Sequence, residues 1–232
     1  MPVMSLVERY CRLLTLFPAS SGVTAVVVRW VGCAASDVAL KARWMKTAWL
    51  DGTSQGVAAV TFGQVPYIDD DGFILYESRA ICRYLNKKYP GSELTPTPGD
   101  IKAEALFDQA WSVETSHFHA AMLKLVTFVV FYPFYGRTVE PEALAEAQKE
   151  LEAKLDVYET ILSKQKYIAG DKLSLVDLFH LSHGPLLTRY ADIRVMYDEK
   201  RPNVLRWWKE ITAYPEWVRL EKQEAIKSIL SY

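Results

Sequence analysis

The spacing of apolar and polar residues changes along the chain and separates two regions. In the first region, segments 67–68 and 73–76 are strand-like, and an acidic pair followed by Gly72 lies between them. An Asp-Gly pair between short apolar runs is a strong local signal for a β-hairpin. The sequence therefore predicts a hairpin here, followed by a helix that opens at Glu77 and Ser78.

Upstream of the hairpin, the pattern predicts one strand and one helix. Residues 12–17 (RLLTLF) form a short apolar run, and apolar residues recur on one helical face from Val23 onward. Gly32 is of a residue type that commonly ends helices. The region up to residue 86 is therefore expected to form a mixed α/β domain.

Beyond a polar stretch rich in Pro and Gly, the chain is expected to be helical. Residues 87–100 lose all periodicity, which is typical of an exposed linker. Long helical patterns cover residues 101–132 and 140–163, and shorter ones follow Pro202 and Pro215. The predicted organisation is an α/β domain at 1–86, a linker at 87–100 and an all-α domain at 101–232.

The motif SLVD at residues 174–177 predicts the start of another helix. Ser174 stands at the N-cap and Asp177 follows three residues later, which is the arrangement of a capping box. The two side chains are expected to satisfy backbone N–H groups that would otherwise be buried without a partner. Losing such a cap typically costs about 0.5–2 kcal/mol.

The charge and composition of the chain argue against some classes of binding partner. The 232-residue chain has a formal net charge of −1, and it carries no basic patch with interleaved aromatic residues. This argues against nucleic acid or an anionic membrane as a partner, and the longest apolar run, residues 125–134, is too short to cross a bilayer. The three cysteines form no CxxC pair and the N-terminus lacks a signal-like core, so a cytoplasmic location is expected.

Two long motifs carry a family resemblance. The segments FGQVPYIDDDGFILYESRAI (62–81) and YIAGDKLSLVDLFHL (167–181), in this order, resemble the cytosolic glutathione transferases, and in particular the phi class and its fungal relatives. The resemblance implies the glutathione-transferase fold, a thioredoxin-like domain followed by an α-helical one. It also implies a dimeric cytoplasmic detoxification enzyme that conjugates glutathione to small hydrophobic electrophiles. Glutathione would be a co-substrate, with no bound cofactor and no metal.

The resemblance places the thiol-activating site at PASS, residues 18–21. Ser20 aligns with the serine that stabilises the glutathione thiolate in the family, and Ser21 lies beside it at the expected helix start. A helix N-terminus with hydroxyl donors lowers the pKa of a nearby thiol, and the thiolate is the nucleophile. Ser20 would then act as a hydrogen-bond donor and not as a covalent nucleophile.

Glutathione itself is expected to bind at two further places. By the resemblance, Gln64 lies near the glycyl end, and a kink at Pro66 turns the backbone of Val65 outward to pair with the extended peptide. Ser78 caps the helix after the hairpin and receives the γ-glutamyl carboxylate, while Glu77 receives the ammonium group. A plain N-cap with an acidic neighbour is the alternative interpretation of the last two residues.

The helical domain offers two more candidates. In the family the first long helix faces the acceptor, so Phe118 and Met122 are candidate contacts of an electrophile, although an aromatic and Met stripe at this spacing equally indicates plain core. His117 and His119 flank Phe118. Further ligands at metal-binding spacing are not evident in the sequence, so cleft-lining polar residues are favoured over a zinc site.

The stretch between residues 22 and 61 departs from the family pattern. It lacks the arginine pair and the His-Lys pair that grips the glycyl carboxylate, and it contains no Glu, Pro, Phe, Tyr or Ile. Divergence of the segment and a compensated frame shift both explain this composition. The departure keeps an alternative function open, namely a weakly catalytic or non-catalytic relative that binds hydrophobic ligands or protein partners.

Overall fold

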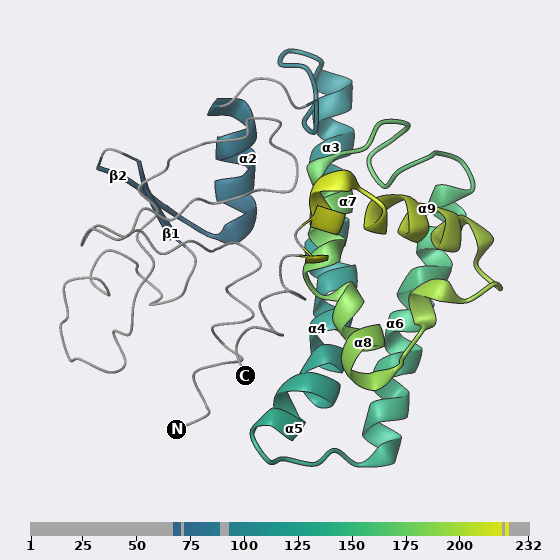
Figure 1. Cartoon of the computed structure of the whole chain (residues 1–232). Coiled ribbons are helices and arrows are strands. Elements are labelled where there is room, and N and C mark those ends of the chain that lie inside the picture. The colour runs from purple at the N-terminus through teal and green to yellow at the C-terminus, as the bar shows by residue number, and fades with distance from the viewer. Residues whose placement is uncertain (1–66, 71, 89–92, 220, 223–232) are drawn as a thin grey trace. The chain divides into compact units, whose positions relative to one another are not determined.

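The computed structural model describes residues 67–70, 72–88, 93–219 and 221–222, and the chain divides into two units, residues 1–92 and 93–232. The division falls inside the predicted linker 87–100. The strand expected at 12–17 and the helix expected from Val23 lie outside the described residues. Each unit is described by itself below, with elements labelled as in Figure 1.

The first unit contains the hairpin that the sequence predicts. Strand β1 (Tyr67–Asp70) pairs antiparallel with β2 (Phe73–Tyr76), and Asp70 lies opposite Phe73 (Figure 1). The chain reverses between them, and Gly72 has φ 91°, a value that residues with a side chain rarely adopt. Helix α2 (Ser78–Lys88) follows and buries an apolar side that includes Ile81 and Leu85.

A polar contact ties the end of β1 to the last turns of α2. The Asp70 carboxylate accepts hydrogen bonds from the Tyr84 hydroxyl and from the Lys88 ammonium group through the same oxygen. The Lys88 and Tyr84 donors hold the pKa of Asp70 below its usual value. The hairpin and helix of the first unit are therefore joined by charge as well as by apolar packing.

The second unit begins with one long helical run that contains two π-helical segments. Helix α3 (Ile101–Val113) leads into the π-segment η2 (Glu114–His119), then α4 (Ala120–Val126), the π-segment η3 (Thr127–Phe131) and α5 (Tyr132–Phe134). Asp100 caps the run, because its side chain accepts from the Ala103 N–H at 3.1 Å. Within the part of the chain that the structure describes, no helix has the length and apolar character needed to cross a membrane.

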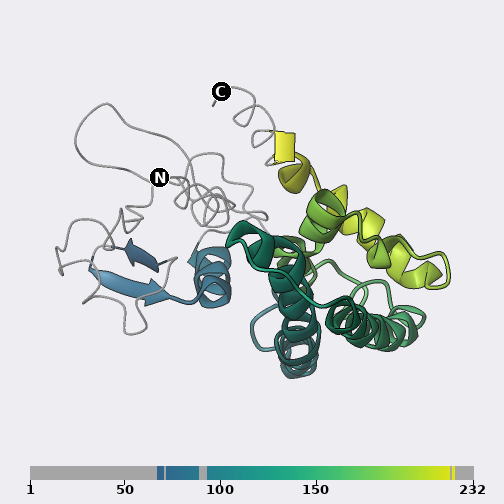
Figure 2. The ribbon, with the colours of Figure 1, turned by 90° about the horizontal axis from the view of Figure 1, so that it is seen from below.

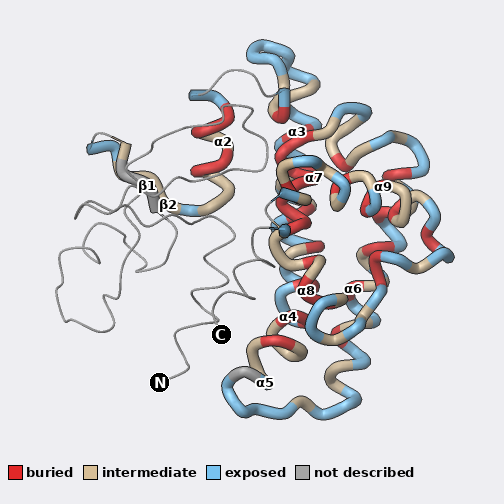
Figure 3. The backbone as a smooth tube through the Cα atoms, viewed as in Figure 1, coloured by how far each residue is buried: buried red, intermediate tan, exposed pale blue. Residues whose placement is uncertain are grey.

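The remaining helices pack on this run around an apolar core. They are α6 (Pro141–Leu162), α7 (Leu175–Phe179), α8 (Gly184–Ala191) and α9 (Pro202–Thr212), and residues 215–219 are also helical. Figures 1 and 2 show α4 and α6 side by side, and Figure 3 shows buried residues on the facing sides of the helices. The helical pattern predicted for residues 140–163 is confirmed by α6, whose buried side includes Leu151, Leu155, Tyr158 and Leu162.

The predicted capping box forms at the start of α7, and its carboxylate does more than cap. One oxygen of Asp177 accepts from the Ser174 N–H at 2.9 Å and from the Ser174 hydroxyl at 2.8 Å. The other accepts from the Ile168 N–H and from the Trp207 indole N–H, each at 2.9 Å. Asp177 is 0% exposed, so its charge is stabilised by four donors from three segments.

A second carboxylate caps a helix across the fold. Glu159 on α6 accepts from the backbone N–H groups of Asn203 and Val204, and also from the Asn203 side-chain amide. These two residues lie in the first turn of α9, whose N–H groups have no partners within the helix. Glu159 therefore fixes the N-terminus of α9 to the last turn of the core helix α6.

Candidate functional site

The junction between β2 and α2 carries two of the predicted glutathione-binding residues. Glu77 is exposed and has φ 70°, in the left-handed region that residues with a Cβ avoid. Its carbonyl accepts from the Ile81 N–H at 2.9 Å, which makes Glu77 the residue that precedes the first helical turn. Non-glycine residues held in such conformations concentrate at ligand sites and cost of order 1–3 kcal/mol.

This placement corrects the expected role of Ser78 by one residue. Helix α2 begins at Ser78 itself, so Ser78 is the first helical residue and Glu77 occupies the position predicted for the cap. The reason lies in the backbone, because the left-handed conformation at Glu77 already turns the strand into the helix. Ser78 is half-buried, and its hydroxyl has no hydrogen-bond partner among the described residues.

The electrostatics of α2 favour an anion at this end. The first turn of α2 contains no acidic residue, whereas the last turn carries Lys87 and Lys88. The N–H groups of the first turn, which have no acceptor within the helix, and the helix dipole therefore place partial positive charge beside the Ser78 hydroxyl. The neighbouring Glu77 carboxylate supplies a negative charge. A ligand that carries a carboxylate and an ammonium group on one carbon matches this pair of charges.

The other predicted glutathione-binding and thiol-activating residues are Ser20, Ser21, Gln64, Val65 and Pro66. They all lie outside the described residues. The structure therefore positions one end of the predicted site, the part made by Glu77 and Ser78. The thiol-activating and peptide-pairing parts stay predictions from the sequence.

The acceptor-pocket assignment of Phe118 and Met122 is corrected by their burial. Phe118 is 1% exposed and Met122 is 0% exposed. The Phe118 ring lies 4.3 Å from the centroid of the His180 ring and 5.6 Å from that of Tyr158. Both side chains belong to the core of the helical unit, which is the alternative that the sequence also allowed. The helical spacing is the same for a pocket and for a core, and only the packed neighbours distinguish them.

The same core contains a polar cluster that the sequence does not reveal. The Nδ1 atom of His180 lies 2.8 Å from the Val176 carbonyl, to which it donates, so its Nε2 atom accepts from the Tyr158 hydroxyl at 3.1 Å. Glu114, at 1% exposure, lies in the π-segment next to these groups, and its charge acts on both. Burial lowers the pKa of His180 and raises that of Tyr158, so both are neutral at pH 7.

The remaining histidines lie apart from this cluster. His117 is exposed, and the ring of His119 packs edge-on against that of His183 with centroids 4.9 Å apart. Among the described residues, no three metal-ligating side chains come together. The described contacts of His119, His180 and His183 include packing against neighbouring rings.

Two known domain families match this chain. A family model described as "Glutathione S-transferase, N-terminal domain" matches residues 32–93, and one described as "Glutathione S-transferase, C-terminal domain" matches residues 118–215. The first match includes residues 32–61, which belong to the stretch that departs from the family motifs. The two matches come in the order of the two units.

Individual relatives agree with the family models. Glutathione S-transferase hmp2 of Hypomyces subiculosus is 43% identical over 161 residues, which are 68% of this chain and 74% of that protein. Glutathione S-transferase F11 of Arabidopsis thaliana is 36% identical over 68% of this chain and 74% of its own length. Among solved structures, glutathione S-transferase I from maize in complex with an atrazine glutathione conjugate is 31% identical. The structural match covers 73% of this chain and 78% of the maize chain, with a TM-score of 0.67.

Proposed function

The chain belongs to the glutathione S-transferase family, and on this premise we propose that it conjugates glutathione to small hydrophobic electrophiles. It is a transferase with the two-domain fold of that family, and it resembles the phi-class enzymes. The observation that carries the proposal is the start of α2. There the positive φ of Glu77 sets its carboxylate beside the N-terminus of α2, and the two ends supply one negative and one partial positive charge.

The γ-glutamyl end of glutathione supplies the matching groups. Its α-carboxylate accepts hydrogen bonds from the first-turn N–H groups of α2 and from the Ser78 hydroxyl. Its ammonium group donates to the Glu77 carboxylate. The backbone of Val65, turned outward at Pro66, pairs with the cysteinyl part of the peptide, and Gln64 contacts the glycyl end.

The thiol would be activated at Ser20, with Ser21 beside it. Hydroxyl donors near a helix N-terminus stabilise the thiolate, so the thiol releases its proton to solvent at a lower pH. The thiolate sulfur then donates its electron pair to an electrophilic carbon of the acceptor, and a C–S bond forms as the leaving group departs with the displaced electron pair. The atrazine glutathione conjugate bound to the maize enzyme supports an apolar ring compound as the class of acceptor.

The setting of the reaction follows from the same resemblance. We propose that the enzyme acts as a homodimer in the cytoplasm, where it detoxifies reactive apolar compounds, with glutathione as co-substrate and no further cofactor.

The test separates binding from activation. Glutathione binding is measured by calorimetry, and ionisation of the bound thiol is followed by ultraviolet absorbance. The comparison includes wild type, Ser20→Ala and Glu77→Gln. Ser20→Ala should raise the pKa of the bound thiol and reduce turnover while affinity stays nearly the same. Glu77→Gln should weaken binding roughly 10- to 100-fold, because it removes a charged hydrogen-bond acceptor.

The exposed Glu142 on α6 provides the matched control, since Glu142→Gln makes the same change away from the junction. Affinity that is equal in Glu77→Gln and Glu142→Gln would remove Glu77 from the site. Unchanged turnover in Ser20→Ala would remove Ser20 from the mechanism. Tight binding of glutathione by a wild-type protein that shows no turnover would favour the alternative, a non-catalytic relative that binds ligands or partners.

A further inference from the structure

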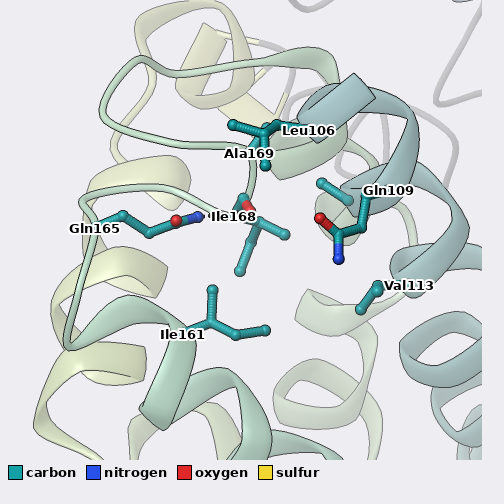
Figure 4. A pocket seen from close by; sticks show the side chains of 8 residues that line it. Leu106, Gln109, Val113, Ile161, Gln165, Ile168 and Ala169 are labelled. Atoms are coloured by element: carbon teal, nitrogen blue, oxygen red, sulfur yellow. Dashed lines mark hydrogen bonds between the residues drawn. The ribbon is translucent and has the colours of Figure 1, made fainter. Parts of the chain in front are cut away.

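A pocket of about 180 Å³ opens on the helical unit between α3 and the end of α6. Its apolar wall is made by Leu106, Ala110 and Val113 of α3, together with Ile161 of α6 and Ile168 of the loop that follows (Figure 4). These α3 residues repeat at a spacing of three and four, so they share one side of the helix. Among the described residues that line the pocket, none carries a charge.

The loop wall of this pocket is held in place by hydrogen bonds. The side-chain amide of Gln165 donates to the carbonyls of Tyr167 and Ile168 at 2.7 and 2.8 Å. The Ile168 N–H donates to the buried Asp177 at 2.9 Å, and the Tyr167 N–H donates to the Gly170 carbonyl at 2.7 Å. The pocket is therefore formed before any ligand arrives, which reduces the entropy lost on binding.

Two amide groups give the pocket its polar character. The NH2 group of Gln165 is used by the two loop carbonyls, so its carbonyl oxygen remains available as an acceptor. Gln109 makes no hydrogen bond among the described residues, so its whole amide is available. Figure 4 shows these two side chains on opposite sides of the pocket, with Ile161 and Ile168 between them.

We propose that this pocket is a second binding site, for one compact neutral ring compound that carries a hydroxyl or N–H group. An apolar cavity of about 150 Å³ is known to hold a molecule the size of benzene, so this pocket holds one or two fused rings. The amides of Gln109 and Gln165 hydrogen-bond the polar group, and the absence of charge among the lining residues disfavours anions. The site shares no residue with the junction at Glu77 and Ser78 and does not depend on the proposed transfer reaction.

The test uses 1-naphthol as the probe and 1-naphthoate as its charged counterpart. Both are titrated by calorimetry into the full chain with saturating S-hexylglutathione, which occupies the glutathione and acceptor sites of the proposed transferase. One equivalent of 1-naphthol should bind at sub-millimolar concentration, and 1-naphthoate should bind at least ten times more weakly. Absence of 1-naphthol binding under these conditions, whether water or a second copy of the chain fills the pocket, overturns the proposal.

Variants at Gln109 locate the probe. Gln109→Trp places a ring in the pocket from an exposed position and should weaken 1-naphthol binding at least tenfold, while Gln109→Leu should weaken it about 3- to 10-fold by removing the amide. Gln148→Leu on α6 is the matched control and should bind as wild type. Equal binding by wild type and Gln109→Trp overturns the proposal. Conjugation of glutathione should be the same in all three variants, so a loss of transferase activity reports on the other site.

Discussion

The buried carboxylate of Asp177 allows a quantitative prediction. Asp177→Asn keeps the shape of the side chain but replaces one acceptor oxygen by an NH2 group. The remaining oxygen continues to accept from Ile168 and Trp207. The new NH2 group then faces the Ser174 N–H, which in wild type donates to a carboxylate oxygen at 2.9 Å, so two donors oppose each other. The Ser174 hydroxyl can rotate to accept from the NH2 group, so that contact survives.

The cost follows from what is left unpaired. One charge-assisted hydrogen bond contributes about 1.5–3 kcal/mol, and the buried Ser174 N–H that loses its acceptor costs a similar desolvation energy. The lost hydrogen-bond energy and the desolvation energy of the unpaired N–H overlap, so they do not add fully. The expected decrease in the free energy of unfolding is about 2–4 kcal/mol. A domain of this kind is stable by only about 5–15 kcal/mol, so the decrease is easily measured.

The assay is unfolding in urea at pH 7, followed by the fluorescence of the buried Trp207 and Trp208. Asp171→Asn is the matched control, because Asp171 is exposed and the oxygen that accepts from the Lys166 N–H at 3.1 Å is kept in asparagine. The control should lie within about 0.5 kcal/mol of wild type. An Asp177→Asn protein that also stays within this margin, with an unchanged dependence on urea, would show that the four donors do not stabilise the charge as argued.

Two further predictions concern the helical unit. Because burial lowers the pKa of His180 below its ordinary 6.5, its contribution to stability is present above about pH 6.5 and is lost as the pH falls through the folded-state pKa. The free energy of unfolding should therefore decrease from pH 7 to pH 5 in wild type and in His117→Gln, and a slope that is equally steep in His180→Gln would contradict this origin. Glu159→Ala should cost about 1–2 kcal/mol by uncapping α9, whereas Glu146→Ala on the exposed side of α6 should cost less than about 0.5 kcal/mol. Equal thermal midpoints for these two variants would refute the capping role of Glu159.

The sequence predicts local structure well where the signal and its partner lie within a few residues of each other. The hairpin follows from the acidic pair before Gly72, because a tight turn between two strands needs a residue that adopts a positive φ, and glycine does so readily. The capping box at Ser174 and Asp177 is equally direct, since both partners lie within four residues. The buried stripe of α6 follows from its spacing alone.

The sequence fails where spacing does not identify the partner. Phe118 has the spacing expected of either a pocket or a core, and the packed rings of Tyr158 and His180 decide for the core. Glu114 belongs to the buried cluster, yet a glutamate in a helix is usually a surface residue. The left-handed turn at Glu77 is invisible as well, because Glu is not a residue type that favours this conformation.

The bond between Asp177 and Trp207 has a consequence for how the protein is made. The two residues are 30 positions apart, so at 5–20 residues per second the ribosome adds Trp207 roughly 2–6 s after Asp177. During this interval the carboxylate lacks its indole donor, because α9 (Pro202–Thr212), which carries that donor, is incomplete. A nascent chain that stops before Trp207 would therefore leave a charged group short of one donor inside an unfinished core, and chaperones and proteases would meet it in that state.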